Sequence, residues 1–121
     1  MISVVTSSLF VETERPERYV KQLLSHLTRV KPDPEGGPDR ARFVSSDVEA
    51  GTQLAFTDDG TTPDESNYTL LVCEPERGVA VTHNASSEEK LERLEKVVTG
   101  HLWRFIHGRE AQYPDHERNA G

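Results

Sequence analysis

The chain has 121 residues, of which 34% are hydrophobic and 29% charged, a balance typical of one folded domain with its own core. Its single cysteine excludes an intrachain disulfide and a zinc site built on several thiolates. A net charge of −7 argues against sequence-independent nucleic-acid binding and against anionic membrane surfaces, because both need clustered positive charge.

The N-terminal stretch, residues 2–11, predicts a strand. Val5, Ser7, Leu9 and Val11 alternate with other residues and so share one face of the extended chain. The stretch has no basic start, and no apolar run in the chain approaches the length of a membrane span. We therefore expect a cytoplasmic protein without membrane association.

A first helix follows the turn at residues 12–16. Thr13 is a candidate N-cap, and Pro16 is tolerated in a first turn whose amides have no helical partner. Apolar residues then recur at three- and four-residue steps, which gathers them on one face. They are Tyr19, Val20, Leu23, Leu24, Leu27 and Val30. Pro32 ends the helix, and residues 31–39, with three prolines and two glycines, predict a loop.

Four short strands are predicted next, over residues 40–46, 52–57, 68–74 and 78–83. Short turns separate the members of each pair, and the acidic segment 58–67 separates the two pairs. This spacing predicts an antiparallel meander of hairpins. The alternating apolar residues are Tyr68, Leu70 and Val72 in one strand and Val79 and Val81 in the next.

The stretch from Ser86 to His107 predicts a second, longer helix. Ser86 followed by Glu89 has the form of a capping box, and Gly108 can serve as the C-terminal cap. The apolar stripe comprises Leu91, Leu94, Val97, Val98, Leu102, Phe105 and Ile106.

Together these elements predict an α+β fold with a single antiparallel sheet of about five strands, in the order β-α-β-β-β-β-α. Both helices are expected on one face of the sheet. Residues 1–110 form the domain, and the polar residues 111–121 are expected to fray. The other face of the sheet could pair with a second subunit, so a homodimer is left open.

The two helices carry a recognisable pattern of residues. It reads Arg18-Tyr19-x-Lys21-Gln22-Leu23-x-x-His26 in the first and Leu91-x-x-Leu94-x-x-Val97-Val98-x-x-His101-Leu102-x-Arg104-Phe105 in the second. This pattern resembles an uncharacterised bacterial family catalogued as domain of unknown function 2218, over about residues 7–30 and 78–110. Proteins of that family occur alone or with siderophore-interacting flavoproteins, so the resemblance implies a siderophore-interacting flavin reductase or a ferric siderophore as partner.

The chain departs from the family at two places. Leu24 stands where members often have cysteine, so a thiol at that position is not needed here. The chain ends in AQYPDHERNAG, where members often have a strand with a tryptophan, and the resemblance therefore leaves a final strand in question.

His26 and His101 are the sharpest candidates for a functional site. Each lies at the edge of the apolar stripe of its helix, and side-by-side helices could bring both imidazoles to one groove. Histidine is a common metal ligand and the usual acid–base residue near neutral pH. The alternative, which we favour, is that each donates to a backbone carbonyl or a carboxylate, because a metal site needs more ligands than two histidines.

Arginine and aromatic residues on the same helices are further candidates. Arg18 and Arg104 could hold a carboxylate or catecholate oxygen, or form ordinary salt bridges. Tyr19 and Trp103 could contact a partner, or pack against the sheet and neighbouring loops. Cys73 lies in a strand without a basic neighbour, which predicts an inert thiol.

The sequence specifies no reaction, cofactor or metal. We expect a non-enzymatic accessory module that binds through Arg18, Tyr19, His26, His101, Trp103 and Arg104. The alternatives are a small enzyme that uses His26 or His101 as acid–base, and a structural domain that binds a partner through an exposed apolar patch.

Overall fold

The computed structural model describes residues 5–28, 43–49, 51–57, 64, 66–108, 113 and 116–120. The loop predicted at residues 31–39 lies outside this part of the chain, as do Val30 and most of the acidic segment. Among the described residues, no helix is both long and apolar enough to cross a membrane.

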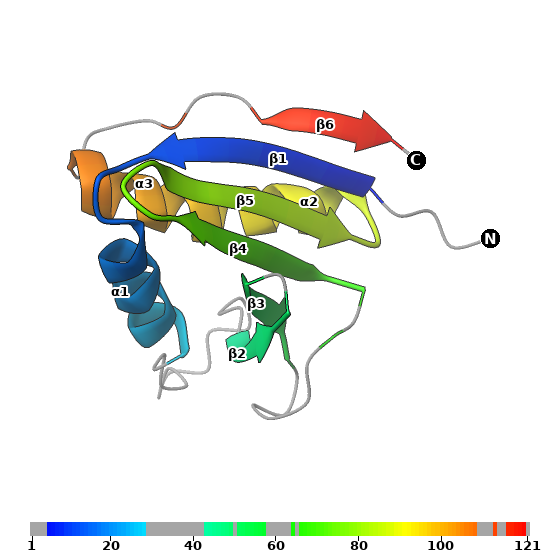
Figure 1. Cartoon of the computed structure of the whole chain (residues 1–121). Helices are drawn as coiled ribbons and strands as arrows, with labels where there is room; N and C mark the ends of the chain where they lie inside the picture. Colours follow the sequence, from blue (N-terminus) through cyan, green and yellow to red (C-terminus); the bar gives the residue numbers. More distant parts are fainter. Residues whose placement is uncertain are drawn as a thin grey trace.

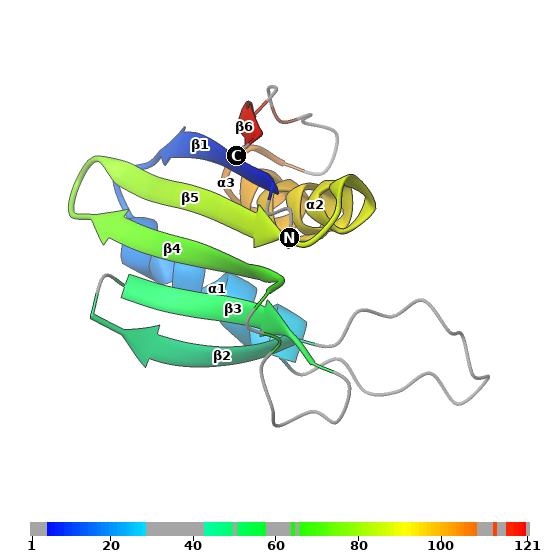
Figure 2. The ribbon, with the colours of Figure 1, turned by 90° about the vertical axis from the view of Figure 1, so that its right-hand side faces the viewer.

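Six antiparallel strands form one sheet in the order β2-β3-β4-β5-β1-β6 (Figure 1). They are β1 (Val5–Glu12), β2 (Phe43–Val48), β3 (Gly51–Phe56), β4 (Tyr68–Glu74), β5 (Gly78–Ala85) and β6 (Glu117–Ala120). The helical segments are α1 (Pro16–Thr28), α2 (Glu88–Leu94), η1 (Glu95–Thr99) and α3 (Gly100–His107). Figure 2 shows the helices behind the sheet, on one of its faces. The predicted α+β class, the element order and the packing of the helices on one face are confirmed.

The C-terminal strand β6 differs from the expectation that residues 111–121 fray. It pairs with the outer edge of β1, from Ser8 opposite Glu117 to Val5 opposite Ala120. An edge strand offers unpaired backbone amides and carbonyls, and an extended segment of any polarity can satisfy them. The polar composition of the tail therefore gave no sign of this strand.

The face of β1 that the sequence predicts to be covered does face the helices. Val11 and Ser7 are buried, and Leu9 and Val5 pack partly against the core. The predicted alternation of Val79 and Val81 also marks a buried face. In β4 the covered residues are instead Thr69 and Leu71, because Leu71 lies opposite Val81 and Thr69 lies opposite His83.

The first helix begins at Pro16, and Thr13 is not its N-cap. The Thr13 hydroxyl accepts a hydrogen bond from the Arg15 amide at 3.2 Å, which closes a local turn just before the helix. The Thr13 amide donates to the Arg77 carbonyl at 3.1 Å and ties this turn to the β4–β5 hairpin.

The second helix is continuous from α2 to α3, with the π-helical turn η1 in its middle. Its N-cap is Ser87, whose hydroxyl accepts from the Lys90 amide at 3.2 Å, and not the predicted Ser86. Ser86 instead donates its backbone amide to Asn67 Oδ1 at 2.9 Å. Gly108 ends the helix as predicted, with its amide bonded to the Arg104 carbonyl at 2.8 Å.

The space between the helices and the sheet is filled by apolar side chains. The largest fully buried ones come from both layers: Leu23, Leu54, Leu71, Leu91, Leu94, Leu102, Val11, Val79, Val81 and Val98. Close packing of this kind leaves a solid interior, so a site in the described part of the molecule must lie on the surface or among buried polar groups.

Candidate functional site

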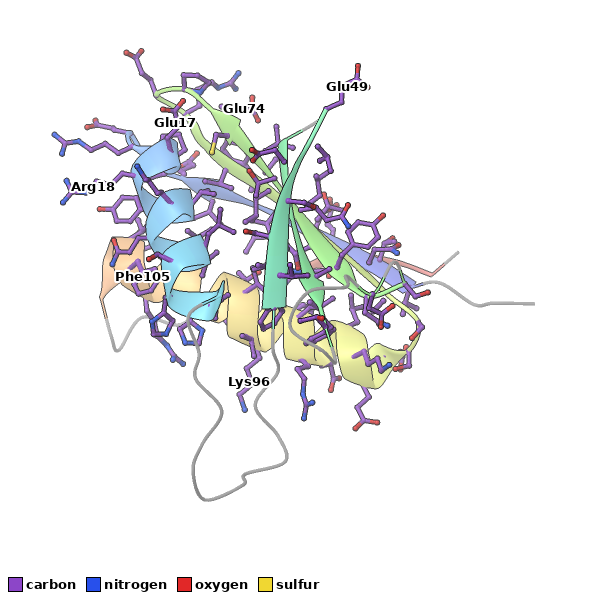
Figure 3. The ribbon with its side chains drawn as sticks, turned by 90° about the horizontal axis from the view of Figure 1, so that it is seen from below. Glu17, Arg18, Glu49, Glu74, Lys96 and Phe105 are labelled. Carbon is purple, nitrogen blue, oxygen red and sulfur yellow. The ribbon has the colours of Figure 1, made fainter. Side chains whose placement is uncertain are left out.

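His26 and His101 meet at the surface where α1 packs against α3. Their ring centroids lie 5.0 Å apart, and the ring planes are inclined by 41°. Phe105, one turn after His101, presents its ring edge-on to His26 at 5.8 Å. His26 is exposed and His101 is half-buried. We call His26, His101 and Phe105 the helix seam; Figure 3 shows Phe105 beside α1.

The hydrogen bonding of His101 fixes its tautomer. Its Nδ1 lies 2.5 Å from the Val97 carbonyl oxygen, which can only accept, so Nδ1 carries the proton. Nε2 of the neutral ring is then an acceptor. The seam can thus offer imidazole nitrogens and aromatic edges to a ligand. Among the described residues, no group of three or more histidine, cysteine or acidic side chains could hold a metal ion.

The other predicted site residues lie in different surroundings. Arg18 points away from the sheet (Figure 3) and lines an open cavity of about 320 Å³ with Glu14, Pro75 and Glu76. Trp103 is half-buried, with its ring 4.2 Å from that of His107. The structure therefore brings His26 and His101 together and places Arg18 and Trp103 elsewhere.

Tyr19 and Arg104 complete the set. Tyr19 is half-buried and packs against the core. Arg104 is exposed, three positions after His101. Residues at that spacing are neighbours on a helix surface, so Arg104 adds a permanent positive charge beside the seam.

A second group of polar side chains lies inside the molecule, centred on His83. His83 is completely buried in β5 and is bonded at both ring nitrogens. Its Nδ1 lies 2.6 Å from the Thr69 hydroxyl of β4, and its Nε2 lies 2.7 Å from the Thr99 hydroxyl. Burial, with a smaller contribution from nearby His116, lowers the pKa of His83 to about 3. His83 is therefore neutral near physiological pH.

The group continues from Thr99 to the C-terminal segment. The Thr99 hydroxyl also lies 2.9 Å from His116 Nε2, and His116 Nδ1 lies 3.7 Å from Glu95 Oε2. The side chains of His116 and Glu95 are only 2% and 8% exposed. Thr69, His83, Thr99, His116 and Glu95 thus form one continuous series, which we call the buried polar chain.

The π-helical turn supplies two members of this chain. Glu95 is the first residue of η1 and Thr99 is the last. A π-helical turn accommodates one more residue than an α-helical turn and often occurs at functional sites. Here the turn brings both side chains against the tail residue His116.

Ser7 borders the buried polar chain without joining it. It lies directly opposite His83 in the β1–β5 pair and is 1% exposed. Its hydroxyl is buried and has no hydrogen-bond partner in the part of the chain that the structure describes. An orphaned buried hydroxyl is costly, by about 1–3 kcal/mol.

The sequence held a partial signal for the buried polar chain. Extending the alternation of Val79 and Val81 by one step places His83 on the covered face. The alternation of the apolar residues alone ends at Val81 and does not include His83. His116 had no such signal, because a residue in a polar tail gives no local indication of a long-range contact.

Cys73 shows no sign of reactivity. It is partly buried, and burial raises the pKa of its thiol, with a further contribution from Glu17. A raised pKa disfavours the nucleophilic thiolate, which agrees with the inert thiol predicted from the sequence.

Comparison with known proteins places the chain in a family without giving it an activity. No curated protein and no solved structure is significantly similar to it. The family model described as "Uncharacterized protein conserved in bacteria (DUF2218)" matches residues 10–113, which is most of the chain. The chain therefore belongs to this family.

Proposed function

We propose that the protein is a non-enzymatic accessory module of siderophore and iron handling, acting in the cytoplasm and binding an anionic aromatic ligand or a protein partner at the helix seam. The iron context comes from the resemblance of the chain to this family, whose members occur alone or with siderophore-interacting flavoproteins. The choice of the helix seam as the binding surface rests on one observation, the accessible contact between His26 and His101.

The chemistry of the seam supports a ligand of this class. Two imidazoles and the Phe105 ring offer polar nitrogens and aromatic edges within a small area. Arg104 adds a guanidinium group that can hold carboxylate or catecholate oxygens. A catecholate siderophore combines such oxygens with aromatic rings.

The seam is an accessible contact between two helices, with His26 exposed, which suits a ligand or partner that docks on the surface. A catalytic histidine needs a concave site that orients a substrate and excludes water. Neither the cavity at Arg18 nor a second one, near Ser8 and Glu117, is lined by His26 or His101. The outer face of the sheet, where Phe10 and Val48 are exposed, could receive a second copy of the chain.

Trp103 provides the test. It is the single tryptophan and lies on α3 with His101, but at a two-residue step that puts it on another side of the helix. Its fluorescence therefore reports a ligand at the seam by energy transfer across the helix and not by direct contact. We expect saturable quenching by a ferric catecholate siderophore or by the flavin reductase. The His26→Gln/His101→Gln double variant should bind at least about 10-fold more weakly, a loss of about 1.4 kcal/mol.

The matched control is Lys96→Gln. Lys96 is exposed and points away from the sheet on the outer side of the second helix, so its loss should leave the titration unchanged (Figure 3). If neither the siderophore nor the reductase changes the Trp103 fluorescence, the proposal is wrong. Equal binding by the double variant would move the site away from the seam.

A further inference from the structure

When the Thr99 hydroxyl donates within the buried polar chain, the protons of the chain run in one of two directions. Each hydroxyl has one proton to donate, and a neutral imidazole donates from one nitrogen and accepts at the other. Thr99 is the decisive member, because its hydroxyl lies between Nε2 of His83, at 2.7 Å, and Nε2 of His116, at 2.9 Å. Thr99 can donate to only one of these nitrogens, so the other must donate to Thr99.

In the outward direction, every donor points towards the C-terminal segment. Thr99 donates to His116, and His83 donates from Nε2 to Thr99. Nδ1 of His83 then accepts from the Thr69 hydroxyl. The proton of His116 is on Nδ1, facing the Glu95 carboxylate. The Glu95–His116 pair holds one proton in this arrangement.

In the inward direction, every donor is reversed. Nε2 of His116 donates to Thr99, Thr99 donates to Nε2 of His83, and Nδ1 of His83 donates to Thr69. Nδ1 of His116 still faces Glu95 Oε2, and two bare acceptors would repel each other. A second proton must therefore lie on His116 or on Glu95. The pair holds two protons whichever group carries the second one.

We propose that one proton gained or lost by the Glu95–His116 pair reverses the buried polar chain and switches the tautomer of His83. His83 carries its proton on Nε2 when the pair holds one proton, and on Nδ1 when it holds two. The switch links the C-terminal segment, where His116 directly precedes β6, to the centre of the sheet, where β5 pairs with both β1 and β4.

The surroundings of the chain allow this change without charging His83. The lowered pKa of His83, about 3, keeps this ring neutral while the pair titrates. Described titratable side chains that lie close to His116 include Glu95 from η1, His83 from β5 and Tyr113 from the preceding segment. Arg104 of α3 acts on Tyr113 from outside this group, and Ser7 of β1 brings no charge.

Nitrogen-15 NMR of the histidine rings tests the proposal on the full chain. Long-range proton–nitrogen spectra distinguish the two neutral tautomers and the charged ring. Between about pH 5 and about pH 8, the range in which histidines ordinarily titrate, we expect the signals of His83 to move from the Nδ1–H to the Nε2–H form as pH rises. The midpoint should equal that of His116. A His83 tautomer that stays constant over this range would overturn the proposal.

Variants at Thr99 test whether the His83 tautomer follows the titration of His116 through the Thr99 hydroxyl, which we call the relay, or through a general effect of pH. Thr99→Val keeps the shape and removes the shared hydroxyl, so His116 should titrate while the His83 tautomer no longer follows. Thr99→Ser keeps the hydroxyl and should preserve the coupled change, even if the valine variant folds poorly. Thr82→Val, at an exposed position beside His83, is the matched control and should behave as wild type. Coupling that survives in Thr99→Val, or is lost in Thr99→Ser, would contradict the relay.

Discussion

Ser7 of β1 and His83 of β5 are direct cross-strand partners on the covered face of the sheet, yet their polar atoms differ in hydrogen bonding. His83 has a hydroxyl at each ring nitrogen, whereas the Ser7 hydroxyl has no partner among the described residues. The sheet therefore supports a satisfied polar centre next to an unsatisfied one.

Removing the Ser7 hydroxyl should stabilise the fold. Ser7→Ala deletes a buried donor that lacks a partner, so the free energy of unfolding should rise by about 1 kcal/mol. Urea unfolding at neutral pH measures this change. Ser8→Ala, on the opposite face of β1, is the control and should change stability by less than about 0.5 kcal/mol. A loss of stability in Ser7→Ala would mean that the hydroxyl is bonded in solution.

Acid should destabilise the protein through His83. The unfolded chain binds a proton at this residue below about pH 6.5, whereas the folded chain, with its lowered pKa, does not until about pH 3. Stability is therefore lost as pH falls through this window. The slope attributable to one proton approaches about 1.4 kcal/mol per pH unit.

Comparison with His83→Gln isolates this contribution. The wild type and the variant share their other titrating groups, so the difference between their unfolding free energies should shrink steadily from about pH 6 to about pH 4. The measurement is a series of urea unfolding curves at intervals of half a pH unit. Parallel pH profiles for the two proteins would contradict the neutral, buried state of His83.

The close approach of β1 to the β4–β5 hairpin requires glycine at position 78. A Cβ atom at Gly78 would overlap the carbonyl oxygen of Val11, a backbone atom that cannot move aside on its own. We expect Gly78→Ala to lower the thermal midpoint, with a cost above about 2 kcal/mol. Gly108→Ala is the matched control. Gly108 also has a positive φ, but it has open space around it, so its cost should be about 1 kcal/mol. Equal costs would show that conformation alone, and not the contact, requires Gly78.

The corrected N-cap gives a further test. Ser87→Ala removes the hydroxyl that accepts from the Lys90 amide and should cost about 1 kcal/mol. Ser86→Ala should cost less, because the Ser86 amide keeps its bond to Asn67 and its hydroxyl contact there is long, at 3.3 Å. Thermal unfolding of the two variants ranks them, and the opposite ranking would restore Ser86 as the cap.

Much of the fold was predictable because local patterns decide it. Alternating residues in β1 and β5, and the three- and four-residue steps of both helices, identify covered faces without tertiary information. Features that depend on distant contacts were not predictable. Strand β6 exists because β1 has a free edge, and η1 uses residues that suit an α-helix equally well.

In the candidate site, too, the features set by local patterns were predictable and those set by distant contacts were not. The meeting of His26 and His101 follows from two local stripes on adjacent helices, and the structure brings the two rings together. In β4 the alternation of apolar residues does not mark the covered face. Tyr68, Leu70 and Val72 lie on the face away from the helices, while Thr69 lies inside. The contact of His116 with Thr99 joins a tail to a helix, and only the folded chain reveals it.

Mapping of ligand binding by amide NMR tests the central claim, that the helix seam is the binding surface, most directly. A siderophore loaded with gallium(III), a diamagnetic substitute for iron(III), would be titrated into the labelled protein. Binding at the seam predicts that the largest amide shifts cluster at His26, His101 and Phe105 and disappear in the His26→Gln/His101→Gln variant. Shifts centred on the outer face of the sheet or on the cavity at Arg18, or no shifts at all, would contradict the claim.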